Sequence, residues 1–415
     1  MDVFDRVMAY NAGREPKRLQ MKLAAMQADP FTFLRGTCHL FYEDWHKSLN
    51  QLKSPSAWIC GDLHLENFGS YKGDNGLVYF DLNDFDECAL APCLWDLTRL
   101  LTSLIVAAKT LKLNASQTDK MLGEMLTRYA KALASGKPKW VERKSAKGMV
   151  KGLLSNLNDR TQKDFLASRT ESRGSKLALV IDGKRALKLS KSEKAAALDL
   201  FKACMQVSNK SDFYYPLDMA RRVAGTGSLG LERYVVLVVG DKGKPRLIDM
   251  KKIGFSALSP YLLIKQANWH SEAQRVATIQ SFTQAIPPAL LKPTNVLSNS
   301  YLIKELQPTQ DRLNLSLWNG NLTKLDDVFE TMAEIVAWGH IRNAAYLQAD
   351  KREVLMRFGA EVELWQAQAL SLAKEAANQT VSQWLEYKKA YAKNKRHATI
   401  IHLYTTSRAR SSLLI

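Results

Sequence analysis

The residues of this 415-residue chain that are best suited to chemistry lie in its first quarter. An apolar run leads into Gly-Asp62-Leu-His-Leu-Glu-Asn67, so an aspartate and an asparagine stand five positions apart on one expected loop. A second acidic cluster, on or just after an expected strand, comprises Asp81, Asp84 and Asp86. Phosphoryl transfer from a nucleotide uses such a set, because one carboxylate orients the attacking group while an amide oxygen and another carboxylate hold Mg²⁺.

Each of these side chains has an expected role. We expect Asp62 to orient or deprotonate the acceptor, and Asn67 and Asp84 to hold the metal ion. Asp86 or Asp81 would be the second acidic ligand, and the sequence leaves the choice of principal ligand among the three aspartates open. Asp and Asn are common in turns, so any one of them alone could simply shape a turn. The combination of intervals favours a functional site.

The interval between Asp62 and Asn67 resembles the catalytic loop of the protein-kinase-like superfamily. The loop is most similar to that of the aminoglycoside and choline kinase branch, which commonly has a histidine two residues after the catalytic aspartate, as His64 is here. Asp84-Phe-Asp86 resembles the metal-binding segment of that branch, and Trp-Asp96-Leu resembles its later structural aspartate. The resemblance implies that Asp96 braces the backbone of the catalytic loop.

A glycine-rich segment, Gly225-Thr226-Gly227-Ser228-Leu-Gly230, comes much later in the chain. Its spacing occurs both in dinucleotide-binding folds and in kinases. A dinucleotide-binding fold needs a helix directly after the third glycine, whereas residues 234–239 are mostly β-branched and favour a strand. Strand, glycine loop and strand is the kinase arrangement, in which backbone amides cover the phosphates. We therefore expect Gly225, Thr226, Gly227, Ser228 and Gly230 to bind a nucleotide.

The next expected strand, 246–253, carries two adjacent lysines. Only one of them can face the cleft, because side chains alternate between the faces of a strand. We favour Lys251 as the lysine that binds the α- and β-phosphates, with Lys252 as the alternative. A helix expected largely over 256–286 would supply the acid that orients this lysine, and Glu272 is the first candidate because it is the only Glu in that segment.

The order of these segments is the reverse of the order in ordinary kinases, where the glycine loop and lysine come first. A circular permutation accounts for this, because a fold depends on which elements touch and not on where the ends lie. The expected fold is therefore α+β: a two-lobed, protein-kinase-like fold in circularly permuted order. Residues 1–174 would supply the catalytic loop and part of the helical lobe, 175–307 a small antiparallel-sheet lobe, and 308–415 the helices that complete the helical lobe.

Within the expected sheet lobe, two short apolar runs, 177–181 and 185–189, flank Asp182-Gly183. An Asp-Gly pair between such runs predicts a β-hairpin. The whole chain also resembles an uncharacterised bacterial family, domain of unknown function 2252. The matching segments follow that family's order and include 29–36, 59–69, 80–87, 95–99 and 225–230. This resemblance implies no established activity.

The composition is that of an ordinary globular protein with a formal net charge of +18. Such a surface attracts anions, including nucleic acid, although no single basic patch favours a nucleic-acid site. One of the basic segments is an expected amphipathic helix near the start, with Arg14, Lys17, Arg18 and Lys22 among apolar residues. The five cysteines lack the paired spacing of a zinc site. The sequence predicts no membrane span and no signal peptide, so we expect a cytoplasmic protein.

The sequence therefore predicts an ATP- and Mg²⁺-dependent phosphotransferase that acts on an unknown small-molecule or protein acceptor. A nucleotide-binding pseudokinase and a nucleotidyl (AMP) transferase with ATP inverted would use the same residues. A basic nucleic-acid-binding protein, in which the acids are incidental, is the alternative from another class.

Overall fold

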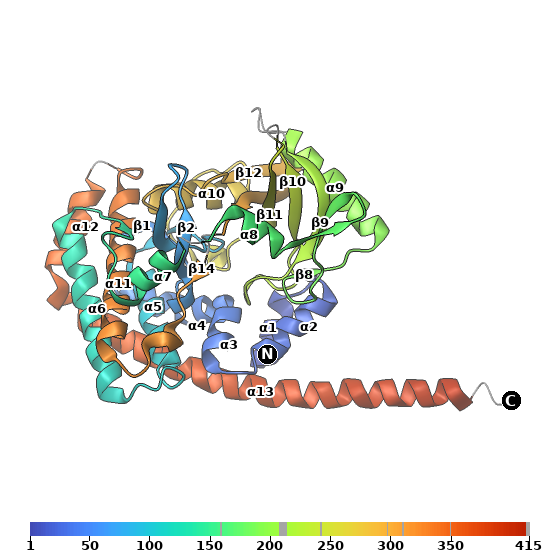
Figure 1. The fold of residues 1–415 in the computed structure, drawn as a ribbon. Helices are drawn as coiled ribbons and strands as arrows, with labels where there is room; N and C mark the ends of the chain where they lie inside the picture. Colours follow the sequence, from blue (N-terminus) through green and yellow to red (C-terminus); the bar gives the residue numbers. More distant parts are fainter. Residues whose placement is uncertain are drawn as a thin grey trace.

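The computed structural model describes residues 1–157, 160–206, 214–240, 243–296, 298–308, 311–348 and 350–411, with side chains as far as residue 394 except that of 206. The architecture is mixed α+β with antiparallel sheets, as expected (Figure 1). Within these ranges no helix is both long enough and apolar enough to cross a membrane.

Four helices form the N-terminal segment, namely α1 (Val3–Tyr10), α2 (Pro16–Ala25), α3 (Pro30–Gly36) and α4 (Cys38–Gln51). The single helix expected near the start is thus two helices. The side chains of Asp2, Glu15 and Asp29 cap the first three helices by accepting hydrogen bonds from backbone N–H groups in the first turn.

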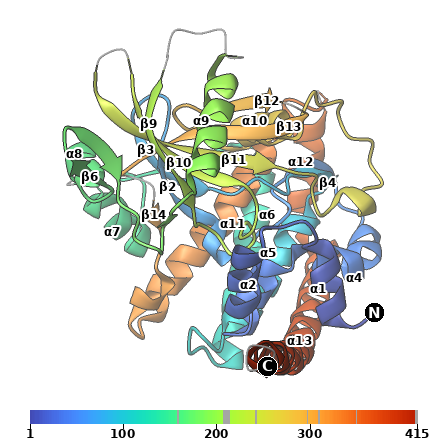
Figure 2. The same cartoon turned by 90° about the vertical axis from the view of Figure 1, so that its right-hand side faces the viewer.

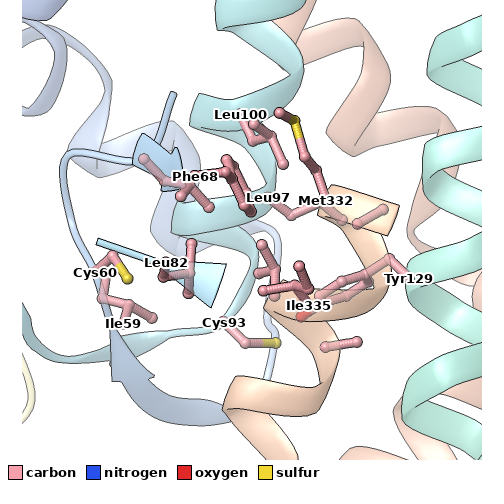
Figure 3. Packing of buried hydrophobic residues seen from close by; sticks show 14 of the residues in the cluster. Ile59, Cys60, Phe68, Leu82, Cys93, Leu97, Leu100, Tyr129, Met332 and Ile335 are labelled. Atoms are coloured by element: carbon pink, nitrogen blue, oxygen red, sulfur yellow. The ribbon is translucent and has the colours of Figure 1, made fainter. Parts of the chain in front are cut away.

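The largest hydrophobic core surrounds α5 (Leu94–Ala107), which is buried along nearly its whole length. This apolar helix packs against the long last helix, α13 (Gln366–Ser411). Beside it, α6 (Ala115–Ser135) packs against α11 (Leu322–Ala344) and α12 (Lys351–Ala360). Figure 3 shows side chains of α5, α6 and α11 within this core, among them Leu97, Tyr129 and Met332.

Two small sheets carry the early acidic segments. In the first, β1 (Ser56–Ile59) pairs with β4 (Ala89–Pro92). The second has the order β14-β2-β3-β5, with bounds Asp311–Arg312, Phe68–Lys72, Val78–Leu82 and Val141–Glu142. The loop between β1 and β2 contains Asp62 and a 3-10 turn, η1 (Leu65–Asn67), while the loop between β3 and β4 contains Asp84.

The largest sheet has six strands in the order β12-β13-β11-β10-β9-β8. Their bounds in chain order are Ala186–Leu187, Tyr215–Arg222, Arg233–Val239, Pro245–Ile253, Lys292–Val296 and Asn299–Leu306. Strands β9 and β10 pair antiparallel on either side of the glycine loop, so the expected strand–loop–strand order is confirmed. Helix α9 (Lys191–Gln206) covers one face of this sheet (Figure 2).

Shorter elements connect these parts: α7 (Gly148–Asn156), α8 (Gln162–Ala167), η2 (Ser259–Tyr261), η3 (Leu315–Trp318) and η4 (Val362–Leu364). The helix expected largely over 256–286 is limited to α10 (Glu272–Thr283), which Ser271 caps through the N–H of Gln274. An irregular segment separates it from η2.

The prediction of a hairpin around Asp182-Gly183 is wrong. Instead, β7 (Lys176–Leu179) pairs with β6 (Thr170–Arg173), and β8 pairs with β9. The Asp182 carboxylate accepts hydrogen bonds from the N–H groups of the three residues 184–186. This local turn satisfies its own backbone, so the strands on either side pair with other partners.

Candidate functional site

Two neighbouring cavities lie between the six-stranded sheet and the early acidic loops. Their volumes are about 390 Å³ and about 780 Å³, within the range of small-molecule sites. The smaller cavity is lined by most residues that the sequence singled out, namely Asp62, Asn67, Asp84, Asp86, Gly225, Thr226, Gly227, Ser228 and Lys251. Gly230 and Lys252 line the larger cavity, whereas Glu272 lines neither.

The two cavities meet at a common wall. The residues that line both are Arg35, Asp62, Asp84, Asp86, Gly227 and Ser228. This wall therefore joins the expected catalytic and metal-binding aspartates to the glycine loop. A ligand in one cavity could thus approach a ligand in the other at Asp62.

Asp96 holds the backbone that leads into Asp62. Its carboxylate, buried at the start of α5, accepts hydrogen bonds from the N–H of Cys60 at 2.7 Å and of Gly61 at 2.9 Å. The His340 ring lies 3.6 Å from the same carboxylate. Asp96 therefore braces the loop, as the resemblance implied.

Asp62 is held by a fully buried arginine on α5. The Arg99 Nε donates to Asp62 Oδ1 at 3.0 Å, and its Nη2 also contacts this oxygen. The Arg99 guanidinium in addition lies 4.8 Å from the ring centre of Phe41. Burial raises the pKa of the Asp62 carboxyl, and the charge and hydrogen bonds of Arg99 oppose that rise. The position of this carboxylate is thus fixed by α5.

Two oxygen donors at the smaller cavity are suited to a hard cation. Asn67 is buried, and its Oδ1 has no hydrogen-bond partner within the described residues. Asp84 is exposed to the cavity. Enclosure disfavours the charged form of Asp84, but the nearby cations Lys251, Lys304 and Arg233 outweigh this and lower the pKa of its carboxyl.

No three His, Cys, Asp or Glu side chains of the described ranges converge closely enough to hold a metal ion by themselves. Mg²⁺ usually keeps several waters and is held by one or two carboxylates together with substrate phosphates. Asn67 and Asp84 are therefore oxygen donors of the kind that Mg²⁺ accepts, and the described residues form no closed metal cage.

Lys251 reaches across to the acidic loop, where its amine forms an ion pair with Asp86. Lys252, the next residue on β11, faces the larger cavity, as strand alternation requires. Glu272 pairs instead with Arg275 of its own helix, at 2.7 Å. The carboxylate beside Lys251 in this structure is therefore that of Asp86.

Asp81 lies outside both cavities. Its carboxylate accepts hydrogen bonds from the backbone N–H of Leu82 at 2.8 Å and of Ala285 at 3.2 Å, and lies 3.5 Å from Arg342. These contacts tie β3 to the segment after α10. Of the three aspartates considered as ligands, Asp84 and Asp86 line the smaller cavity.

The glycine loop is held from outside by the N-terminal segment. Arg14 donates to the carbonyl oxygens of Gly227 at 2.6 Å and Leu229 at 2.8 Å. Arg18 donates to Leu231 O at 2.5 Å, and Lys22 to Gly227 O at 3.2 Å. Three cations thus fix the carbonyl side of the loop.

The sheet adds further cations to the smaller cavity. Arg222 and Arg233 both pair with the buried Asp249, and Lys304 lies beside them. Burial opposes ionisation of Asp249, yet the two arginines hold the pKa of its carboxyl far below the usual value. Burial lowers the pKa of the Lys304 amine to about 8.

Sequence reasoning missed the site contacts of Arg99, Arg14 and Lys22. Arg99 carried a signal, because a cation inside an apolar helix needs a partner when it is buried. Arg14 and Lys22 lie on an amphipathic segment, and nothing in their spacing indicates a loop that lies about half the chain away.

The chain matches one family model, described as an uncharacterized protein conserved in bacteria (DUF2252), over residues 14–390. The matched residues include the acidic loops, the glycine loop and the N-terminal cations. No curated protein and no solved structure gave a match.

Proposed function

The chain belongs to the bacterial family DUF2252, and on that premise we propose that it is an ATP- and Mg²⁺-dependent phosphotransferase with a protein-kinase-like site. In this proposal the six-stranded sheet is the small lobe of a circularly permuted kinase-like fold, and helices from both ends of the chain form the large lobe. The observation that carries it is the ion pair between Lys251 and Asp86, made at the cavity that Asn67, Asp84 and the glycine loop also line.

The nucleotide would lie in the smaller cavity. Lys251 would bind its phosphates, and the amides of the glycine loop would cover them. Asn67 and Asp84 would hold Mg²⁺, with Asp86 as a further ligand, because the unpartnered amide oxygen and the exposed carboxylate are the oxygen ligands that this ion prefers. The bound Mg²⁺ would supply neutralisation of the phosphate charge.

Asp62 would act on the acceptor at the wall between the cavities. Arg99 fixes its Oδ1, so the other carboxylate oxygen can accept a hydrogen bond from an acceptor hydroxyl. The acceptor oxygen would form a bond to the γ-phosphorus while the bond from that phosphorus to the bridging oxygen breaks. ADP would leave, and the hydroxyl proton would pass to Asp62 or to water.

Thermal stabilisation by ATP with Mg²⁺ tests the nucleotide site. We expect ATP·Mg²⁺ to raise the melting temperature of the wild type, and Asp84→Asn and Lys251→Met to lose most of that rise, because each variant removes a group that contacts the metal or the phosphates. Lys17→Met, on the exposed face of α2, is the matched control. Equal stabilisation of all four proteins would place the nucleotide elsewhere on the chain.

Nucleotidyl transfer is a second candidate, favoured by the cations on the sheet. Arg222, Arg233 and Lys304 extend the positive charge of the smaller cavity beyond Lys251. They could hold the β- and γ-phosphates of an inverted ATP, which would bring the α-phosphorus to Asp84. Pyrophosphate would then leave when the acceptor bonds to that phosphorus.

The product separates the two candidates. ATP labelled at the α- or the γ-phosphorus is incubated with the protein, Mg²⁺ and a metabolite extract, and the released nucleotide is identified. Phosphoryl transfer gives ADP and a γ-labelled product, whereas nucleotidyl transfer gives pyrophosphate and an α-labelled product. ATP binding without either product would indicate a pseudokinase.

A further inference from the structure

The larger cavity lies beside the smaller cavity in which the nucleotide is proposed to bind. Its volume is about 780 Å³, and it meets the nucleotide cavity only at the common wall that contains Asp62. The rest of its lining comes mainly from the N-terminal segment, the far side of the glycine loop and the end of β11. An acceptor bound here would lie next to Asp62.

Two cations in this cavity have no carboxylate partner. Lys22 is almost fully buried, at 1% exposure, and its hydrogen bond goes to a loop carbonyl. Arg14 likewise donates to carbonyls. Neither makes an ion pair with any described residue. Asp62 and Glu87 lie near Lys22, and Glu87 and Asp86 lie near Arg14, but none of these carboxylates forms an ion pair with them. Burial disfavours both charges, so the two side chains are suited to an anion that contacts them directly.

The other charged groups of the lining are largely satisfied within the protein. Arg18 pairs with Glu15, Arg35 with Glu66, and Arg221 with Glu193. Glu232 accepts hydrogen bonds from two tyrosines, those of 234 and 301. The Glu87 carboxylate accepts a hydrogen bond from the backbone N–H of Ala257. The remaining carboxylates of the lining, those of Asp62, Asp84 and Asp86, all lie at the common wall. Away from that wall, the charged groups left for a ligand are therefore mostly cationic.

We infer that the larger cavity binds the acceptor, and that the acceptor is a small molecule with an anionic group, a carboxylate or a phosphate, held by Lys22 and Arg14. This inference rests on the proposed function and narrows its substrate class. It separates this chain from kinases whose acceptors are cationic, because a cationic acceptor would meet Lys22 and Arg14 instead of free carboxylates.

Calorimetric titration tests this inference with four probes that all carry hydroxyl groups. Glycerol 3-phosphate and glycerate are the anionic probes, and choline and kanamycin are the cationic ones. Each is titrated into the full chain at matched ionic strength, because a protein with a net charge of +18 also attracts anions weakly. We expect an anionic probe to bind with one site, and the cationic probes not to bind.

Variants locate the binding. Lys22→Met keeps a side chain of similar length. We expect it to lower the affinity for the anionic probe at least about tenfold, because a charge-assisted hydrogen bond is lost. Lys17→Met, on the exposed face of the same helix, should bind the probe as the wild type does. The far-ultraviolet circular dichroism spectrum and the cooperative thermal unfolding of all three proteins should be alike, which shows that Lys22→Met is folded.

Three results would overturn the inference: binding of choline or kanamycin in place of the anions, no binding of either anionic probe, or equal affinity of Lys22→Met and wild type for the anion. The proposed nucleotide site fails by a different result. That result is an equal shift of the melting temperature by ATP·Mg²⁺ in the wild type and Asp84→Asn, or no shift in either, and it does not depend on whether the anionic probes bind.

Discussion

Gly61 shows how strongly a single position of the loop that contains Asp62 is constrained. Its φ is +83°, and a Cβ there would lie 2.3 Å from the carbonyl oxygen of Glu87. Gly76, on an exposed turn, has the same φ, but the nearest atom to its Cβ would be 4.0 Å away. Both positions have a left-handed backbone conformation, which favours glycine. Only at Gly61 is there also no room for a Cβ atom.

The pair Gly61→Ala and Gly76→Ala separates these two requirements. We expect Gly76→Ala to lower the free energy of unfolding by about 1–2 kcal/mol, the cost of a left-handed alanine. Gly61→Ala should lower it by at least about 3 kcal/mol, because backbone must also move. Urea unfolding of both variants measures the difference. Equal losses would mean that the Glu87 backbone yields freely and that the loop is not tightly held.

At this scale, the sequence could predict residues whose partners are close along the chain. Asp62, Asn67, Asp84 and Asp86 follow from short intervals, and all four line one cavity. Glu272 was chosen by searching only the expected helix, yet it pairs with Arg275 three positions later. The acid that meets Lys251 comes from a loop 165 residues earlier. No local pattern carries that information.

At the scale of elements, the glycine loop and the N-terminal helices act as one unit. The loop gives its carbonyl oxygens to Arg14, Arg18 and Lys22, and Gly230 O accepts a further hydrogen bond from the N–H of Glu15 at 3.0 Å. Glycine loops are mobile without support, so these contacts should set how far this one moves.

Hydrogen exchange measures that support. We expect Arg14→Met to speed amide exchange in peptides that cover 223–232, because the Gly227 and Leu229 carbonyls lose a donor that they share. Exchange in α5, which packs in the helical core, should not change. Lys17→Met should exchange as the wild type does throughout. Unchanged exchange of the loop in Arg14→Met would mean that β9 and β10 alone hold it.

The sequence predicted elements well where one periodic pattern covers the whole element. The apolar segment around Trp95-Asp96-Leu97 forms α5, and the strands expected on either side of the glycine loop are β9 and β10. The expected Asp182-Gly183 hairpin failed because turn chemistry predicts a turn and not the pairing of its strands. Residues 176–179 pair with 170–173, a segment that precedes the expected sheet lobe of 175–307.

At the scale of the whole molecule, segments from distant parts of the chain meet at the two cavities. The early acidic loops contribute carboxylates, and the late sheet contributes the lysine and the glycine loop. The Gln307 side chain accepts a hydrogen bond from the Lys72 N–H and donates one to the Lys72 carbonyl oxygen, which joins the end of the six-stranded sheet to the small sheet of β2 and β3. The permuted kinase-like order stays a prediction, because the sequence shows which motifs are present and their mutual placement depends on tertiary contacts.

The ion pair between Lys251 and Asp86 is where this meeting can be measured. A double-mutant cycle with Lys251→Met, Asp86→Asn and the double variant should give a coupling free energy of about 1–3 kcal/mol, because each single change leaves a charge of low exposure without its partner. The control cycle uses Arg246 and Glu305, a partly exposed pair 3.2 Å apart within the sheet, for which we expect less than about 1 kcal/mol.

The cycle also responds to the proposed ligand. If ATP·Mg²⁺ binds in the smaller cavity, Lys251 turns to its phosphates and Asp86 to the metal ion, so the coupling between the two side chains should fall when the nucleotide is present. The coupling between Arg246 and Glu305 should stay the same. A coupling near zero without nucleotide would mean that the pair does not link the sheet to the acidic loop. If ATP·Mg²⁺ leaves the coupling unchanged, the nucleotide does not contact Lys251 and Asp86.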